Sequence, residues 1–442
     1  MIHGPEHPDA GRRLDREILG LAIPAFATLV AEPLLILVDT FVIAHLGTPH
    51  LGGLTLASSV LAIVIGLSVF LAYGTTATVS RRIGAGDRAG ALAGGLDGLA
   101  LGLIIGLAAV LVLVPGAPVI LAWYGGTPEV TALGVQYLRI VALGLPAQML
   151  MLASTGVLRG LQDTRTPLRV VVTVNLLNIA LNVVLVLGWG FGIQGAAAGT
   201  AISQWVGALI MAGLVLRGAR REGVALRPHP TGVLAAARLG GWLVVRNGSL
   251  QAALALTTVT AASLGTVALA AHQVVAAVWA LVAHGLDAFA IAAQAMVGLR
   301  LGGGHTAAAR GVLRRVLAWG AGFGAVTGVL LVLVRTPLAG LFGTDGAVQD
   351  AAAAALLVVA LAAPIGAVAF QFDGILIGAG DARFLAIAGL VTTAVYAPFV
   401  LAVMATDAGL TWLWAAYAGW LGCRSIALAW RTRGTAWMRT GA

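Results

Sequence analysis

The sequence predicts an all-α polytopic membrane protein, with twelve transmembrane helices in two parallel-repeat six-helix bundles around a central cleft. Three observations support this fold class. Of the 442 residues, 60% are hydrophobic and only 10% are charged, whereas a soluble protein of this length needs a far more polar surface. Apolar runs of about 20 residues or more recur along the chain. The second half of the sequence also repeats landmarks of the first half at a constant offset.

Each apolar run is interpreted as one membrane-spanning helix. The first run follows several arginines, but it is too long for the apolar part of a signal peptide and no clear cleavage site follows it. The predicted spans are residues 17–45, 52–80, 91–122, 130–158, 168–188, 194–216, 237–263, 268–299, 311–334, 348–377, 384–405 and 411–431.

The basic residues, all of them arginine, support this count and orient the chain. Arginines cluster in every second connection between the predicted spans, and only Arg335 departs from the alternation. Because cytoplasmic loops carry such an excess, we expect a multi-pass protein of the cytoplasmic membrane with both termini in the cytoplasm. The net charge of +9 comes from these loop clusters, so it does not indicate nucleic-acid binding.

An internal repeat relates the two halves of the chain. At an offset of 218 residues, "LGT" at 46–48 falls on "LGT" at 264–266, Pro146 falls on Pro364, and "GLQDTR" at 160–165 falls on "GAGDAR" at 378–383. Each repeat holds an even number of spans, so the halves cross the membrane in the same direction, with a substrate site expected near the midplane. The predicted domains are residues 1–216 and 233–442, joined by a cytoplasmic linker at 217–232.

Acidic residues inside the predicted spans are candidates for function, because an ionised carboxylate at the bilayer centre costs about 2.5–3.5 kcal/mol on insertion scales. Asp39 lies deep in the first span, and an acid there can couple transport to protons by binding and releasing one. A structural hydrogen bond is the alternative. Asp97 and Asp373 lie near cytoplasmic span ends. There, contact with interface water for Asp97, or a helix-end or loop hydrogen bond for Asp373, is the alternative to a role in transport. The five acids are Glu32, Asp39, Asp97, Asp287 and Asp373.

Other polar residues in the spans are few. Asn178 and Asn182 in the fifth span are four residues apart and share a helix face. We expect them to form a polar network with Asp39, although amides in membranes also serve as structural contacts between helices. The arginines expected inside spans are Arg139 and Arg246, both near span ends.

Five stretches of the sequence together resemble the MATE family of multidrug and toxin extrusion transporters, most closely its DinF-like branch. The resemblance covers nearly the whole chain. The stretches are "PLLILVDTFVIAHLG", "RRIGAGDRAGA", "VLRGLQDTRTPL", "NIALNVVLVLGWGFGIQGAAAGTAISQ" and "FDGILIGAGDARFLAI".

The resemblance implies an exporter of amphipathic, often cationic compounds, driven by inward H⁺ or Na⁺. It also implies roles for individual residues. Asp39 matches a first-helix acid tied to cation coupling, Asn178 matches the Asn of a fifth-helix "N-x-x-x-D" pattern, and Thr200 matches a sixth-helix Thr near the same pocket. Pro24 resembles a first-helix proline linked to bending, and Pro33 is a second candidate for bending.

One departure from the family pattern concerns the coupling ion. Asn182 stands where the pattern has an Asp, which removes a charge from the pocket. Because Na⁺ prefers several oxygens, commonly including carboxylates, we expect H⁺ coupling through Asp39. A Na⁺ ion held at Asp39 and Asn178 remains the alternative, and no other cofactor or metal is expected. The candidates for the substrate cleft are Gln148, Met149, Met151, Asp287 and Asp373.

The predicted function is a cation-coupled antiporter that acts by alternating access on small organic compounds. We expect contact with membrane lipids and function as a monomer. One alternative is a lipid-linked precursor flippase of the same superfamily, which would be expected to have a cationic cleft. Another is a major-facilitator-type symporter. The stretch "GAGDRAG" is similar to the G-x-x-x-D-R-x-G loop of that family, but its spacing from Gly to Asp is one residue too short. The scattered histidines and the absence of catalytic motifs argue against an enzyme.

Overall fold

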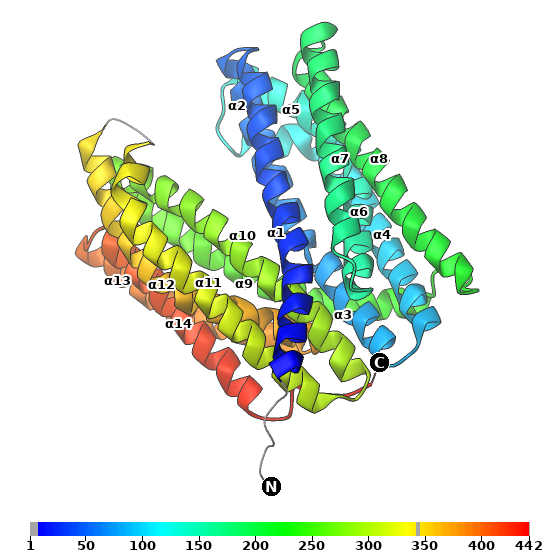
Figure 1. Ribbon diagram of the computed structural model, residues 1–442. Helices are drawn as coiled ribbons and strands as arrows, with labels where there is room; N and C mark the ends of the chain where they lie inside the picture. Colours follow the sequence, from blue (N-terminus) through cyan, green and yellow to red (C-terminus); the bar gives the residue numbers. More distant parts are fainter. Residues whose placement is uncertain (1–7, 342–344, 442) are drawn as a thin grey trace. The chain divides into compact units, whose positions relative to one another are not determined.

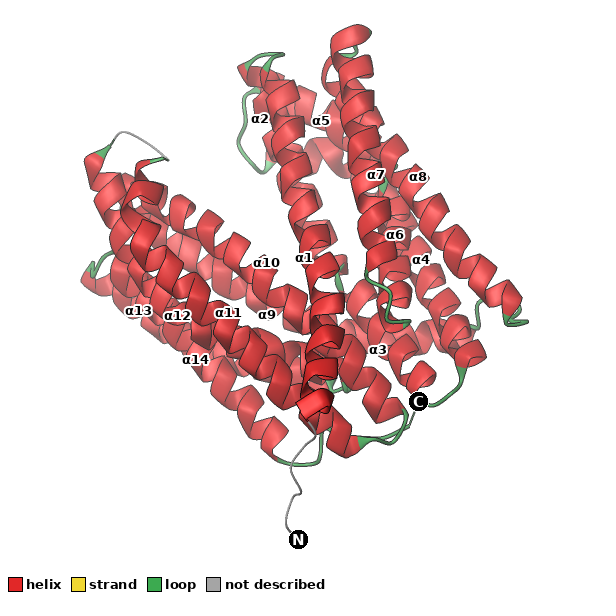
Figure 2. Ribbon diagram, viewed as in Figure 1, coloured by secondary structure: helices red, strands yellow, loops and turns green. Residues whose placement is uncertain are grey.

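The computed structural model describes residues 8–341 and 345–441, and these residues form helices joined by loops, without a strand (Figures 1 and 2). Every predicted span corresponds to one helix or to two consecutive helices. The elements are α1 (Pro8–Ala44), α2 (Thr48–Ser68), α3 (Phe70–Gly84), α4 (Arg88–Ala122), α5 (Pro128–Ala142), α6 (Leu145–Gly160), α7 (Arg165–Asn182), η1 (Val183–Gly188), α8 (Gly192–Arg221), α9 (Pro230–Ser263), α10 (Thr266–Gly302), α11 (Thr306–Gly340), α12 (Gly346–Gly378), α13 (Ala382–Thr406) and α14 (Leu410–Arg433).

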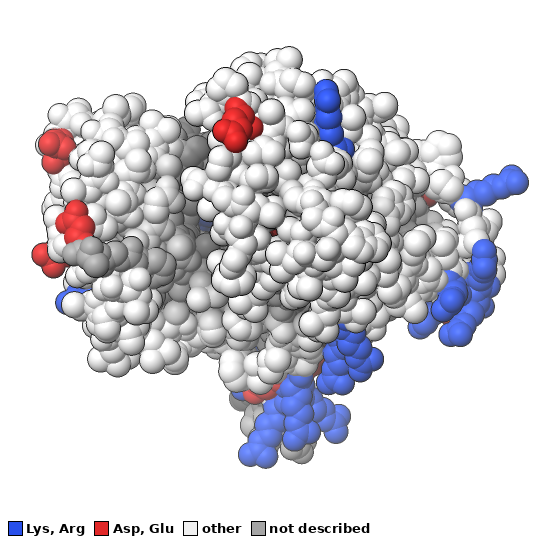
Figure 3. Space-filling model, turned by 90° about the horizontal axis from the view of Figure 1, so that it is seen from above, with Lys and Arg blue, Asp and Glu red and all other residues white. Residues whose placement is uncertain are grey.

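The length and apolarity of the helices make this a multi-pass membrane protein. Among the described residues, 9 helices are long and apolar enough to cross a membrane, or 10 if a bent pair is one span. That pair is α5 and α6, which meet at an angle of 49°. On the face seen in Figure 3, uncharged side chains cover most of the surface, and the basic side chains stand in separate groups. The predicted fold class is thus confirmed.

Three predicted spans are interrupted helices. The second is divided at Val69 into α2 and α3, and the fourth at Leu143–Gly144, just before Pro146. Pro146 cannot donate a backbone hydrogen bond, which weakens the helix at that point. It is not sufficient for a break, because the equivalent Pro364 lies inside the continuous helix α12. In the fifth span, α7 ends at Asn182 and passes into the π-helix η1. Wider π turns often occur at functional positions in helices.

The helix positions confirm the sequence repeat. The helices α2 and α10 start at Thr48 and Thr266, and α4 and α11 start at Arg88 and Thr306. The helices α8 and α14 start at Gly192 and Leu410. Each pair of starts is 218 positions apart, which is the offset found in the sequence. The six helices of the second half therefore follow the order of the six spans of the first half.

Close contacts between helices repeat in the same way. A Cβ atom added at Gly156 would lie 2.5 Å from the carbonyl oxygen of Ala72, and one at Gly374 would lie 2.2 Å from that of Ala290. These two pairs are equivalent under the 218-residue offset. Because small residues let helix backbones approach in membranes, the repeat preserves a packing requirement as well as a helix pattern.

The chain divides into two compact units. One contains residues 8–26 and 241–441, and the other contains residues 27–240. Both α1 and α9 therefore contribute to two units. Within the first unit, Asp15 on α1 forms an ion pair with Arg315 and accepts a hydrogen bond from Trp319, and Glu17 pairs with Arg300. The predicted domain limits, at residues 216 and 233, remain a prediction about the sequence repeat.

We expect Gly374→Ala to lower the melting temperature of the purified protein, because the added methyl group meets a backbone carbonyl that cannot rotate away. Overpacking of this kind costs about 1–3 kcal/mol. Gly419→Ala in α14 is the control, since a Cβ atom there meets nothing within 4 Å. Thermal unfolding in detergent measures both variants, and equal melting temperatures would contradict the predicted packing.

Candidate functional site

The carboxylate of Asp39 is held by an amide in the first half of the repeat. Asp39 lies on α1, five residues before its end, and its side chain is 9% exposed. The Nδ2 atom of Asn182, on α7, donates a hydrogen bond of 2.6 Å to the Oδ1 atom of Asp39. The ion pairs found among the described residues do not include Asp39. An amide thus takes the place that an arginine would occupy in a permanent ion pair.

A chain of hydrogen bonds continues from Asn182 to a third helix. The same Nδ2 atom donates to the Oδ1 atom of Asn178 at 3.0 Å, and the Nδ2 atom of Asn178 donates to the hydroxyl of Thr200 on α8 at 3.0 Å. The hydroxyl of Thr200 donates to the carbonyl oxygen of Ala196. The structure thus brings together all four residues predicted for cation coupling. Asn178 is 1% and Asn182 0% exposed, which places this network in the protein interior.

Tyr137 on α5 is a member of this site that the sequence analysis missed. Its side chain is buried, forms a hydrogen bond with Thr200 and lies close enough to Asp39 to interact with its charge. The available signal was a phenol group within an apolar span, but no spacing connects position 137 with position 39. Asn175 is positioned by a different contact, since its amide donates to the carbonyl oxygen of Ala31 on α1 at 2.8 Å.

One acceptor in the network is left without a donor. The Oδ1 atom of Asn182 is buried and has no hydrogen-bond partner. A Cβ atom added at Gly199 would lie 2.9 Å from it, so a glycine on α8 leaves room for this oxygen. An unsatisfied buried acceptor costs about 1–3 kcal/mol. The site therefore contains a carboxylate, an unused amide oxygen and hydroxyl groups within one buried cluster.

A metal site of the usual kind is not formed. Within residues 8–341 and 345–441, no three His, Cys, Asp or Glu side chains are grouped so that they could hold a metal ion. The oxygens around Asp39 differ from such a site, because most of them belong to amide and hydroxyl groups. Oxygens of these groups can also bind hard cations.

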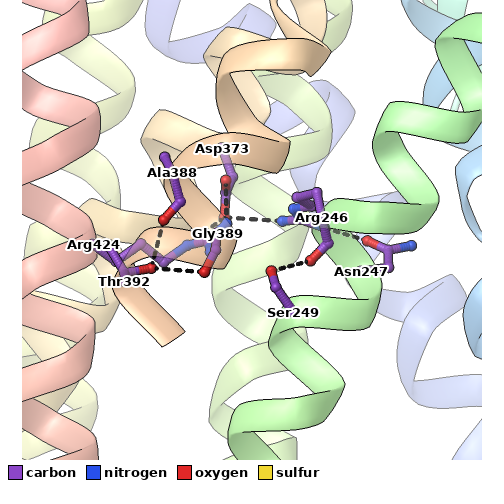
Figure 4. Close-up of polar contacts among 8 residues, drawn as sticks. All are labelled: Arg246, Asn247, Ser249, Asp373, Ala388, Gly389, Thr392 and Arg424. Carbon is purple, nitrogen blue, oxygen red and sulfur yellow. Dashed lines mark hydrogen bonds and ion pairs between the residues drawn. The ribbon is translucent and has the colours of Figure 1, made fainter. Parts of the chain in front are cut away.

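Asp373, proposed from the sequence as a cleft residue, lies in the other unit and in an ionic cluster (Figure 4). Arg424 on α14 and Arg246 on α9 both donate to its carboxylate. The expectation that only Arg139 and Arg246 lie inside spans, near span ends, was wrong. Arg424 is inside the last span, and Arg246 is a buried residue 16 positions after the start of α9. Most arginines of this chain lie in loops, so the pattern by itself favours a loop position for an arginine.

The remaining cleft candidates are distributed differently. Met149 and Met151 are buried, and the sulfur of Met151 lies 2.9 Å from the position of a Cβ atom on Gly207, so it fills a helix contact. Gln148 and Asp287 are half-buried. The role of these residues in substrate binding remains a prediction.

The other residues singled out from the sequence lie as follows. Asp97 accepts a hydrogen bond of 2.7 Å from the backbone N–H of His229, so it fixes the end of the linker. The helix α1 is continuous through Pro24 and Pro33, and the division between the units falls two residues after Pro24. Bending at these prolines remains a prediction. The side chain of Glu32 lies outside the described residues.

The second repeat has a different group at the position equivalent to Asp39. Thr257 and Tyr396 correspond to Asp39 and Asn178 under the 218-residue offset, and their hydroxyl oxygens are 2.7 Å apart. The two repeats thus build a polar contact between the same pair of helices. Only the first repeat places a carboxyl group in it.

Comparisons with known proteins identify relatives over nearly the whole chain. The MatE family model matches residues 24–184 and 244–402. Protein DETOXIFICATION 44, chloroplastic, from Arabidopsis thaliana is 33% identical, with 97% of this chain and 84% of the relative covered. DNA damage-inducible protein F from Escherichia coli is 28% identical, with 94% and 92% covered. These matches confirm the resemblance drawn from the sequence, including its DinF-like branch.

A solved structure supports the fold. A transporter of the MOP superfamily from Pyrococcus furiosus, described as having a binding pocket of reverse polarity, superposes with a TM-score of 0.87. The two sequences are 21% identical, and 97% of each chain is covered. At this identity the likeness concerns the fold alone.

We expect Asn182→Leu to lower the melting temperature, because it removes the donor from a buried carboxylate and from the Asn178 amide. The loss of such a partner costs about 1–3 kcal/mol. Thr173→Ala on the same helix is the control, since its hydroxyl bonds only to the carbonyl oxygen of Arg169. Thermal unfolding of the two variants would refute this role of Asn182 if both behaved as the parent protein.

Proposed function

Because the chain belongs to the MatE family, we propose that it is a proton-coupled antiporter that exports amphipathic or cationic organic compounds. The observation that carries this proposal is the hydrogen bond from Asn182 to the buried carboxylate of Asp39. A carboxylate held by a neutral amide can lose its charge without leaving a buried guanidinium unpaired. Asp39 is therefore suited to bind and release a proton during transport.

The position of the Asn182 amide favours H⁺ over Na⁺. Its nitrogen lies 2.6 Å from an oxygen of Asp39 and 3.0 Å from one of Asn178. These are the two oxygens that a bound Na⁺ ion would have to share, and the N–H groups already occupy the space between them. An Asp at position 182 would instead offer further oxygens, which hard cations prefer.

Protonation changes the hydrogen bonding that this network can make. A neutral carboxyl group has one donor and a weaker acceptor in place of two strong acceptors. The oxygen of Asn182 that lacks a partner can accept from that new donor if the amide turns. Because Asn178, Thr200 and Tyr137 adjoin the same amide or its partners, such a change reaches α5, α7 and α8 as well as α1.

Coupling requires only that protonation and substrate binding disfavour each other. In the proposed cycle, Asp39 is protonated when the site is open to the outside, and the substrate leaves. When the site opens to the cytoplasm, the proton leaves and new substrate binds. Alternating exposure of one site to the two sides of the membrane converts the proton gradient into export.

The proposal also includes the placement of the chain in the cell. The arginine-rich connections support a proposed orientation in the cytoplasmic membrane in which both termini lie in the cytoplasm. Each half of the repeat has its own helices, and a single chain is sufficient for the transport cycle. The chain binds its substrates without chemical change, so it is not an enzyme.

We expect Asp39→Asn to abolish substrate uptake driven by an imposed pH gradient in proteoliposomes. A coupling free energy of about 1–3 kcal/mol corresponds to a loss of roughly 5–150-fold. Thr257→Val is the matched control at the equivalent position of the second repeat and should retain gradient-driven uptake. Undiminished uptake by reconstituted Asp39→Asn protein would refute the coupling role.

We further expect a proton gradient, but not a sodium gradient, to drive uptake of a fluorescent organic cation by the parent protein. Asn182→Asp should add a response to sodium, because it replaces N–H donors with carboxylate oxygens. Each gradient is imposed separately on the same vesicles. Uptake driven equally by sodium in the parent protein would contradict the assignment of H⁺.

A further inference from the structure

A cavity in the first half of the chain is separate from the Asp39 network. It has a volume of about 240 Å³ and lies between α3, α4 and the first turns of α9, within the unit of residues 27–240. Four of its lining residues are polar, and the others are apolar or glycine. The polar residues are Thr75, Thr78, Arg82 and Asp97. The cavity therefore contains one basic and one acidic side chain.

The guanidinium group of Arg82 has no carboxylate partner. Its Nη1 atom donates to the carbonyl oxygen of Gly90, and the ion pairs among the described residues do not include Arg82. The side chain is half-buried. A Cβ atom added at Gly94, on α4, would lie 3.2 Å from the Nη1 atom, so the arginine lies across a glycine. Its other N–H groups are available to a group bound in the cavity.

The carboxylate of Asp97 has one oxygen left for a ligand. Its Oδ1 atom accepts the backbone N–H of His229 at 2.7 Å and lies 3.9 Å from the imidazole of that residue. Its Oδ2 atom accepts no hydrogen bond from the described parts of the chain. A Cβ atom added at Gly232 would overlap with this Oδ2 atom, so a glycine near the start of α9 makes room for it. The cavity thus offers donors from one side chain and an acceptor from another.

The equivalent place in the second repeat is filled by a carboxylate of the chain itself. Under the 218-residue offset, Arg300 corresponds to Arg82 and Glu17 corresponds to Ala235. Glu17 pairs with Arg300 at 3.0 Å. In the first repeat, Ala235 lines the cavity and supplies no charge. The repeat therefore indicates where an anionic group fits beside Arg82, and the chain leaves that place to a ligand.

The cavity is polar at one end and apolar at the other. On each of its three helices, an apolar lining residue lies further from the arginine-rich connections than the polar end does: Leu71 on α3, Leu101 on α4 and Leu239 on α9. A soluble ion would leave this apolar part uncovered. An amphipathic lipid fits both ends, and basic pockets between membrane helices on the cytoplasmic side commonly bind lipid headgroups.

We propose that this cavity binds one phospholipid of the inner leaflet whose headgroup carries a phosphate and an ammonium group, as phosphoethanolamine does. The phosphate accepts hydrogen bonds from Arg82, and the ammonium group donates to the Oδ2 atom of Asp97. The glycerol and the first part of the acyl chains lie against Leu71 and Leu239. The choice of leaflet rests on the proposed orientation, whereas the site itself does not depend on coupling through Asp39.

The test is native mass spectrometry of the purified full-length protein, titrated in detergent with phosphatidylethanolamine, phosphatidylcholine or phosphatidylglycerol. We expect one tightly bound phosphatidylethanolamine per chain, in preference to phosphatidylcholine, whose quaternary ammonium has no N–H for Asp97. Arg82→Gln should weaken this binding by at least about tenfold, because it removes charge-assisted hydrogen bonds. Arg88→Gln is the matched control, since Arg88 is 65% exposed and pairs with Glu222, and it should bind the lipid as the parent protein does.

Two further variants test the assignment of the two charges. Ala235→Glu gives Arg82 the carboxylate that Glu17 gives Arg300, so it should displace the lipid while the melting temperature stays at least as high as that of the parent. Asp97→Asn should weaken the binding of phosphatidylethanolamine more than that of phosphatidylglycerol, which has no ammonium group.

The proposal is overturned if the parent protein shows no preference for phosphatidylethanolamine over phosphatidylcholine. Undiminished binding by Arg82→Gln, or by folded Ala235→Glu, has the same consequence, as does equal weakening of both lipids in Asp97→Asn. Soluble phosphoethanolamine is the remaining control. It should compete poorly because it lacks the apolar part, and effective competition at a concentration equal to that of the lipid would assign the cavity to a small solute instead.

Discussion

The carboxylate of Asp39 sits where water is largely excluded, and the amide of Asn182 satisfies it without neutralising it. This contact determines what the rest of the first half can do. An arginine in the same place would hold the carboxylate permanently ionised, and an apolar side chain would make the charge too costly to keep. The Nδ2 atom of Asn182 links Asp39 to Asn178, and the Nδ2 atom of Asn178 continues the chain to Thr200. In the proposed coupling, this chain carries a change in the protonation of Asp39 to the two other helices.

The buried carboxylate of the second half, that of Asp373, has charged partners in place of an amide. Asp373 is held by Arg246 and Arg424 in a buried ionic cluster. Meanwhile the position equivalent to Asp39 carries Thr257, whose hydroxyl meets that of Tyr396. Two repeats with matching helices and matching close contacts have therefore acquired different chemistry. One offers a carboxyl group free of basic partners, and the other offers a fixed ionic cluster.

The first helix belongs to both compact units. Near its N-terminal end, Asp15 and Glu17 tie it to α11 and α10, while asparagines of α7 bind Asp39 and the carbonyl of Ala31. A change in the hydrogen bonding of Asp39 therefore acts on a helix whose other end is anchored elsewhere. The division falls at Phe26, between Pro24 and Pro33. Proline weakens the helix there by removing backbone hydrogen bonds, which suits a segment shared by two bodies.

The sequence by itself was sufficient for the membrane class, the order and approximate limits of the spans, and the repeat, because these depend on local apolarity and on matches at one offset. It also pointed to Asp39, Asn178, Asn182 and Thr200, partly through the shared face of α7 and partly through family resemblance. Tyr137, the π-helix after Asn182, and the meeting of Arg246, Asp373 and Arg424 were decided only by the tertiary structure. These features depend on which faces of distant helices come together. The sequence around a buried polar side chain does not indicate which distant residue will be its partner.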